Sequence, residues 1–140
     1  MSEESLHRTV VQYLHLAMPE EVYWYHPANG GYKVGKRTAG RLKMMGVRAG
    51  VPDICLVHRG SAIFIELKAP GALAGTTVKG RGYLSPEQRD CHHALRMAGA
   101  IVATCRTLEE VQNTLRNWGV VERRDVAIGG LFAERGATAA

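Results

Sequence analysis

Two carboxylates and a lysine interrupt an otherwise apolar segment, GVPDICLVHRGSAIFIELKAP (residues 50–70). Asp53, Glu66 and Lys68 stand where a plain hydrophobic strand would carry Val or Ile. Carboxylate oxygens favour Mg²⁺ or Mn²⁺ over zinc, and a lysine is a compact cationic donor. The three residue types therefore point to a divalent-cation site, with a strand-end salt-bridge cluster at solvent as the alternative.

The spacing of these residues predicts that they share one face of a hairpin. A two-residue turn at Arg59-Gly60 would pair the two halves of the segment as antiparallel strands. In that register Asp53 lies opposite Glu66, with the two Cβ atoms about 4.5–5.5 Å apart. Lys68 shares this face, because side chains alternate along a strand. Two facing carboxylates destabilise a sheet unless a cation neutralises them.

Hydrophobic periodicity and capping residues predict the elements that must position this hairpin. Ser2 can cap a first helix, and two capping boxes are expected, Ser85 with Gln88 and Thr107 with Glu110. Helices are expected at about residues 3–18, in a short stretch that ends at Gly46, at 86–98 and at 107–118; strands are expected at 22–26, 51–58, 61–68 and 100–105.

Two further polar residues are expected to face the hairpin. Glu3 lies on the apolar stripe of the first helix, and Glu4 is its substitute if the helix is rotated; a surface acid that suits the helix dipole is the alternative. Gln88 can close its capping box or find an inward partner, such as Lys68 or a metal-bound water. It lies on a stripe expected to face the protein: Leu84, Cys91, Leu95 and Ala98.

Composition indicates one globular domain, and its positive charge suggests a polyanionic partner, with a simply basic protein as the alternative. The chain has 140 residues, 46% of them hydrophobic, and a formal net charge of +5. The first residues, MSEESLHRTV, are polar and acidic, and no stretch approaches the ~18 apolar residues of a membrane span. We therefore expect a cytoplasmic protein with no membrane partner. The three cysteines are expected to be reduced, buried side chains.

The histidines and the aromatic cluster are expected to be structural. His92 and His93 are neighbours on a helix and point about 100° apart, so they cannot easily bind one ion. Tyr23, Trp24 and Tyr25 are expected to pack in the core, with stacking on nucleic-acid bases as the alternative.

These motifs, in this order, resemble the PD-(D/E)xK nuclease superfamily and, within it, the virus-type replication-repair nuclease (VRR-NUC) domain. Asp53 matches the first acid of the motif, and Glu66-Leu67-Lys68 matches its E-x-K. An early helical acid (Glu3), an Asn-Gly loop, a basic segment before G-x-P-D and the run LSPEQ extend the similarity over about residues 3–110. The glycine-rich segment after Lys68 is longer than a minimal member needs, and His7 stands where many members carry Gln.

The resemblance implies an α/β, restriction-endonuclease-like fold with a central mixed β-sheet flanked by helices. The nuclease domain would span residues 1–119, and residues 120–140 would be a partly flexible C-terminal extension. The implied activity is Mg²⁺- or Mn²⁺-dependent hydrolysis of DNA, with a homodimer acting on branched substrates such as a Holliday junction during replication, repair or recombination. A non-catalytic nucleic-acid-binding scaffold of the same fold is the alternative.

The resemblance also assigns roles to individual residues. Asp53, Glu66 and the carbonyl of Leu67 would hold the metal, while Lys68, Glu3 and Gln88 would complete the catalytic set. An acidic metal site repels DNA, so cationic walls are needed around it; a solvated basic face is the alternative. The expected DNA-binding residues are Asn29, Arg41, Lys43, Arg48, Lys79 and Arg81.

Overall fold

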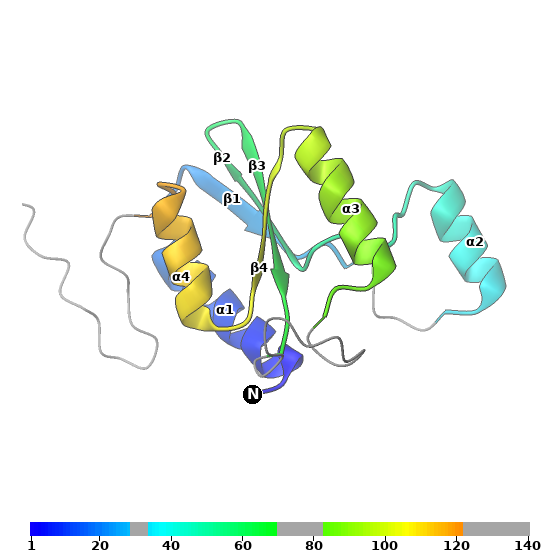
Figure 1. Ribbon diagram of the computed structural model, residues 1–140, viewed down its shortest axis with the longest axis horizontal. Helices are drawn as coiled ribbons and strands as arrows, with labels where there is room; N and C mark the ends of the chain where they lie inside the picture. The colour runs from blue at the N-terminus through cyan, green and yellow to red at the C-terminus, as the bar shows by residue number, and fades with distance from the viewer. Residues whose placement is uncertain (29–33, 70–82, 122–140) are drawn as a thin grey trace, which may run out of the picture.

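A four-stranded mixed sheet forms the centre of the chain in the computed structural model, which describes residues 1–28, 34–69 and 83–121 (Figure 1). The strand order is β1-β2-β3-β4. The elements in chain order are α1 (Glu3–Ala17), β1 (Val22–Tyr25), α2 (Lys36–Met44), β2 (Ile54–His58), β3 (Ser61–Leu67), α3 (Pro86–Met97), β4 (Ile101–Cys105) and α4 (Leu108–Asn117). The expected α/β architecture is therefore confirmed.

The β2–β3 hairpin has the register that its turn predicts. His58 pairs with Ser61, and the pairing continues to Ile54 opposite Ile65. Positive φ angles at Arg59 and Gly60, 48° and 81°, match a two-residue turn whose twist suits a hairpin. The central pairing of the site-bearing segment is thus determined by local turn chemistry.

Strand β2 begins three residues later than the sequence indicates, at Ile54 rather than Val51. Pro52 has no N–H to give to a ladder, and Gly50 has a φ of +80° that belongs to no strand. Asp53 therefore stands just before the ladder, and its side chain is free to accept a hydrogen bond there. Its Oδ2 accepts from the backbone N–H of Leu67 at 2.7 Å.

Helices cover both faces of the sheet. Figure 1 shows α1 and α4 on one side and α3 on the other, with α2 beyond α3. Strands β3 and β4 are parallel, and α3 forms the crossover between them. The main core lies between the sheet and the α1–α4 pair; its buried residues include Leu6, Val10, Tyr13, Leu14, Ile54, Leu56, Ile63, Ile65, Leu67, Val111 and Leu115.

Helix α3 packs differently from its predicted stripe. Leu84, Cys91 and Leu95 are only half-buried, and Ala98 is exposed. The helix is rotated so that Gln88, His92 and Leu95, a row at i, i+4 and i+7 spacing, face the sheet. Ala98 lies at the margin of this row, which is why the expectation for it is wrong.

Two smaller expectations also need correction. In α4, Thr107 accepts from the N–H of Glu110, but the carboxylate of Glu110 accepts from Arg106 rather than from Thr107. The expected reciprocal box is therefore displaced by one residue. On β1, Trp24 packs against the core as expected, but Tyr23 and Tyr25 are exposed, since α3 contacts β4 at the opposite edge of the sheet.

The three cysteines are free, with Cys55 and Cys105 buried and Cys91 half-buried. Among the described helices, none is long and apolar enough to cross a membrane.

Replacing Gly50 with alanine tests the contact between the loop before Asp53 and helix α3. A Cβ at Gly50 would lie 2.2 Å from the carbonyl oxygen of Glu87, whereas one at Gly46 would meet no atom within 4 Å. We expect Gly46→Ala to lower the free energy of unfolding by about 1 kcal/mol, from its positive φ alone. Gly50→Ala should lower it by about 1–3 kcal/mol more, measured by urea unfolding. Equal losses would contradict the contact.

Candidate active site

A cleft of about 530 Å³ opens at the end of the sheet where β2 begins and β3 ends. All the residues expected to be catalytic contribute to its lining, together with one cation of the basic segment: Glu3, Asp53, Glu66, Lys68, Gln88 and Arg48. Side chains from α1, the start of β2, the end of β3 and the start of α3 therefore meet in one place.

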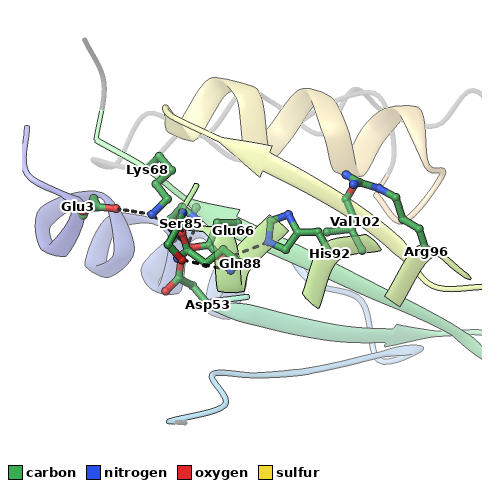
Figure 2. Close-up of polar contacts among 10 residues, drawn as sticks. Glu3, Asp53, Glu66, Lys68, Ser85, Gln88, His92, Arg96 and Val102 are labelled. Atoms are coloured by element: carbon green, nitrogen blue, oxygen red, sulfur yellow. Dashed lines mark hydrogen bonds and ion pairs between the residues drawn. The ribbon is translucent and has the colours of Figure 1, made fainter. Parts of the chain in front are cut away.

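The carboxylate of Glu66 lies at the centre of this cluster and is only 3% exposed (Figure 2). Gln88 donates from Nε2 to Glu66 Oε1 at 2.9 Å. Lys68 Nζ lies 3.9 Å from the same oxygen, and His92 Nε2 lies 3.5 Å from Oε2. Figure 2 shows Glu66 between Lys68 on one side and His92 on the other.

This environment favours the protonated form of Glu66. The pKa of Glu66 is raised to about 8. Burial is the main cause and the negative charge of Asp53 adds to it, while the positive charge of Lys68 acts in the opposite direction. Asp53 is close but differently placed, since its Oδ2 accepts from the Leu67 N–H. The two acids are thus in unequal environments, and their mutual repulsion is relieved only in part by the protein's own lysine.

Lys68 bridges the two acids that come from different elements. Its side chain is 10% exposed, and Nζ lies 3.7 Å from Glu3 Oε1 as well as 3.9 Å from Glu66 Oε1. Glu4 instead pairs with Arg8 at 2.7 Å on the outer surface of α1. The rotation of α1 therefore brings Glu3, rather than Glu4, to the cleft.

Gln88 closes its capping box and also has an inward partner, which is Glu66 rather than the expected Lys68 or metal-bound water. Its Oε1 accepts from the N–H of Ser85 while Ser85 Oγ accepts from the N–H of Gln88, which is a complete capping box. The same amide group donates from Nε2 to Glu66. One side chain therefore caps α3 and contacts the buried carboxylate.

Comparison with protein families decides the identity of the domain. The VRR-NUC domain family matches residues 3–108. The chain belongs to this family. VRR-NUC domains are PD-(D/E)xK nucleases, so the chain carries a nuclease domain.

A solved structure described as a VRR_NUC domain protein has the same fold. Its TM-score is 0.63 at 19% sequence identity, over 84% of this chain and 88% of that one. The comparison with curated proteins found no match.

The acidic cluster of this VRR-NUC domain fits a divalent cation that keeps part of its water shell. Among the described residues, no three His, Cys, Asp or Glu side chains form a ready-made metal cage. Mg²⁺ does not need one, because it commonly binds through one or two carboxylates and several waters. Glu66 Oε2 is buried without a hydrogen-bond partner in the described part of the chain. A buried carboxylate with incomplete hydrogen bonding, near the charge of a second acid, suits a metal ligand.

Two histidines that were expected to have only structural roles lie near the VRR-NUC site. His26 Nδ1 donates to the backbone carbonyl of Asp53, and its ring packs edge-on against His7 at a centroid distance of 4.5 Å. His92 is 1% exposed and faces Glu66. The sequence does place His92 four residues after Gln88, and residues at that spacing share a helix face, so His92 could have been expected to face the same carboxylate as Gln88.

The basic residues expected to bind DNA are not all at the cleft. Arg48 lines it, whereas Arg41 and Lys43 lie on α2, a helix that buries no side chain. In Figure 1, α2 lies beyond α3. Asn29, Lys79 and Arg81, and most of the expected C-terminal extension, lie outside the described residues.

The raised pKa of Glu66 predicts how stability changes with pH in EDTA. The native state keeps a proton on Glu66 up to about pH 8, while the unfolded state loses it near the ordinary value of 4.5. The free energy of unfolding should therefore fall as pH rises, by about 1–2 kcal/mol between pH 6.5 and 8. His7 and His92, whose pKa values burial lowers from 6.5, act in the opposite direction near pH 6.5, where the unfolded state still holds part of their protons, so the fall should be steepest toward pH 8.

Glu66→Gln should remove most of this fall, and the exposed control Glu4→Gln should retain it. Urea unfolding at four or five pH values measures all three proteins. A wild-type stability that is flat or rises over the interval would show that Glu66 is already ionised in the metal-free protein.

Proposed function

We propose that this VRR-NUC domain is a Mg²⁺- or Mn²⁺-dependent endodeoxyribonuclease that cuts branched DNA, such as a four-way junction, in replication, repair or recombination. One observation carries the proposal: the buried carboxylate of Glu66, held by Gln88, lies beside Asp53 and Lys68 in an open cleft. Burying one acid beside another destabilises the free protein. A site that binds a cation explains why the arrangement is retained.

The metal would be held by Asp53, Glu66 and the backbone carbonyl of Leu67. When bound there, a divalent cation would neutralise charge on the scissile phosphate and lower the pKa of an attacking water. The protein's own contribution is to keep the two carboxylates together and largely shielded from solvent. Gln88 restrains Glu66 through one oxygen, and the Leu67 N–H restrains Asp53.

Lys68 is the proposed catalytic donor. Its ammonium group lies between Glu3 and Glu66, so both side chains restrain its position at the cleft. From there it orients the attacking water or stabilises the charge on the phosphate oxygens. Hydrolysis forms one bond from the water oxygen to phosphorus and breaks one phosphorus–ester bond, and the leaving oxygen takes up a proton.

Binding of DNA is assigned to the cations around the cleft. Arg48 lines the cleft itself, and Arg41 and Lys43 lie on a helix with no acidic residue in its sequence, KRTAGRLKM. Asn29, Lys79 and Arg81 are assigned to DNA on the family resemblance. Cutting a four-way junction requires incisions in two strands, so we propose that two copies of the domain act together. DNA as substrate agrees with a cytoplasmic place of action.

A cleavage assay tests the proposal directly. End-labelled four-way junction, flap, single-stranded and duplex DNA are incubated with Mg²⁺, Mn²⁺ or EDTA. We expect cutting only with metal, and fastest on a branched substrate. Lys68→Ala should slow it by about 10²–10³-fold, as loss of a transition-state donor does in other enzymes.

Metal binding is measured separately from cutting. Mn²⁺ at 100 times its Kd should raise the free energy of unfolding by about 2–3 kcal/mol, and Asp53→Asn should abolish that increase. DNA binding without cutting of any substrate, unaffected by metal, would instead support a non-catalytic scaffold.

Glu3 and Glu4 provide a matched pair for the contribution of α1. Both acids lie in the first turn of the helix, so each substitution changes the helix dipole interaction similarly. Only Glu3 contacts Lys68. We expect Glu3→Gln to reduce the cleavage rate at least tenfold (about 1.4 kcal/mol) and Glu4→Gln to leave it within about twofold. Equal effects of the two substitutions would show that Glu3 acts only through the helix end.

A further inference from the structure

Helix α3 is anchored to the sheet by a polar side chain. His92 is the only buried residue of this helix, with 1% of its surface exposed. A surface helix normally buries an apolar stripe, and burying an imidazole without partners destabilises a fold. The position of His92 therefore calls for a reason other than packing.

The geometry around His92 supplies that reason. Its Nε2 lies 3.5 Å from Glu66 Oε2, while Gln88 holds the other oxygen, Oε1, at 2.9 Å. Within the described residues, Glu66 Oε2 and both ring nitrogens of His92 have no hydrogen-bond partner. A charge-assisted N–H···O bond is normally about 2.7–2.9 Å long. Donor and acceptor thus face each other slightly beyond bonding distance, as catalytic contacts often do before the metal or substrate binds.

We propose that His92 is a positioning residue for Glu66, with its Nε2–H donating to Oε2. Gln88 and His92, four residues apart on α3, then hold both oxygens of Glu66 from the same side. This inference rests on the proposed metal-dependent function.

A second contact changes what the carboxylate can do. One hydrogen bond restrains a single oxygen and leaves the group free to pivot about its last carbon–carbon bond. Two contacts on two oxygens fix that rotation, and carboxylates that bind metals commonly need such outer hydrogen bonds.

The position of His92 is itself held by a contact between α3 and the sheet. Arg96, one turn further along α3, donates from Nη2 to the backbone carbonyl of Val102 at 3.1 Å and ties the helix to β4. That bond maintains the register between α3 and the sheet on which His92 depends.

Three substitutions of His92 separate a positioning role from a packing role. His92→Gln places an amide donor near the position of Nε2, His92→Asn places it near Nδ1, and His92→Leu is apolar and of similar size. For each protein, the Kd for Mn²⁺ is measured by calorimetry, the stability in EDTA by urea unfolding, and cleavage as kcat and KM. The Kd and the stability do not depend on activity.

We expect His92→Leu and His92→Asn to weaken Mn²⁺ binding by about 10–100-fold, and His92→Gln to remain within about threefold of wild type. In EDTA, His92→Leu should be as stable as wild type or more so, because it removes partnerless nitrogens from the interior. kcat should follow the same order as the Kd, with KM for DNA little changed.

The inference would be overturned if the His92→Leu protein bound Mn²⁺ as tightly as wild type. If that protein were also less stable than wild type in EDTA, His92 would be assigned to packing. Equal weakening by His92→Gln and His92→Asn would overturn it as well. Wild-type protein that binds no Mn²⁺ would overturn the metal-dependent function, and the inference with it. Failure of the inference alone leaves wild-type binding intact and sensitive to Asp53→Asn.

Discussion

Burial of the Glu66 carboxylate is the constraint on which the rest of this site depends. An acid removed from water beside another acid favours its protonated form, and the raised pKa expresses that penalty. Neighbouring elements offset part of this penalty. Lys68 after β3 and Gln88 on α3 contact the Glu66 carboxylate, and Glu3 on α1 contacts Lys68. These contacts do not offset it completely. The remaining electrostatic imbalance destabilises the metal-free site, and the proposed cation would relieve it.

The same constraint explains why α3 must be placed accurately. Its capping box and its contact with Glu66 share one amide group, so moving the start of the helix by a residue would lose both. Gly50 packs directly against the backbone of Glu87 in the first turn, which ties α3 to the loop that leads into Asp53. Arg48 lies on that loop and lines the cleft. The contact between Gly50 and Glu87 therefore helps to position Asp53 and Arg48 relative to the helix that holds Glu66.

Short-range sequence signals were enough to predict the hairpin and the helix start that carry the site. The orientation of each helix against the sheet was not predictable from them. The hairpin register followed from Arg59-Gly60, and the capping box at Ser85 followed from residue spacing. The choice between Glu3 and Glu4 had to remain open, because it depends on how α1 rotates against β3. His92 was assigned to a structural role for the same kind of reason. Its burial is decided by the angle at which α3 meets the sheet, and no periodic pattern records that angle.

The crossover between β3 and β4 has a consequence for the order in which the chain folds. The β2–β3 hairpin brings Asp53 and Glu66 together through a two-residue turn, so these acids can meet early and with little loss of chain entropy. Gln88 and His92 arrive only when α3 docks and β4 pairs in parallel with β3, which closes a much longer loop. A nascent or partly unfolded chain therefore holds two repelling acids without their restraints. The cleft is therefore complete only when all four strands of the sheet are in place.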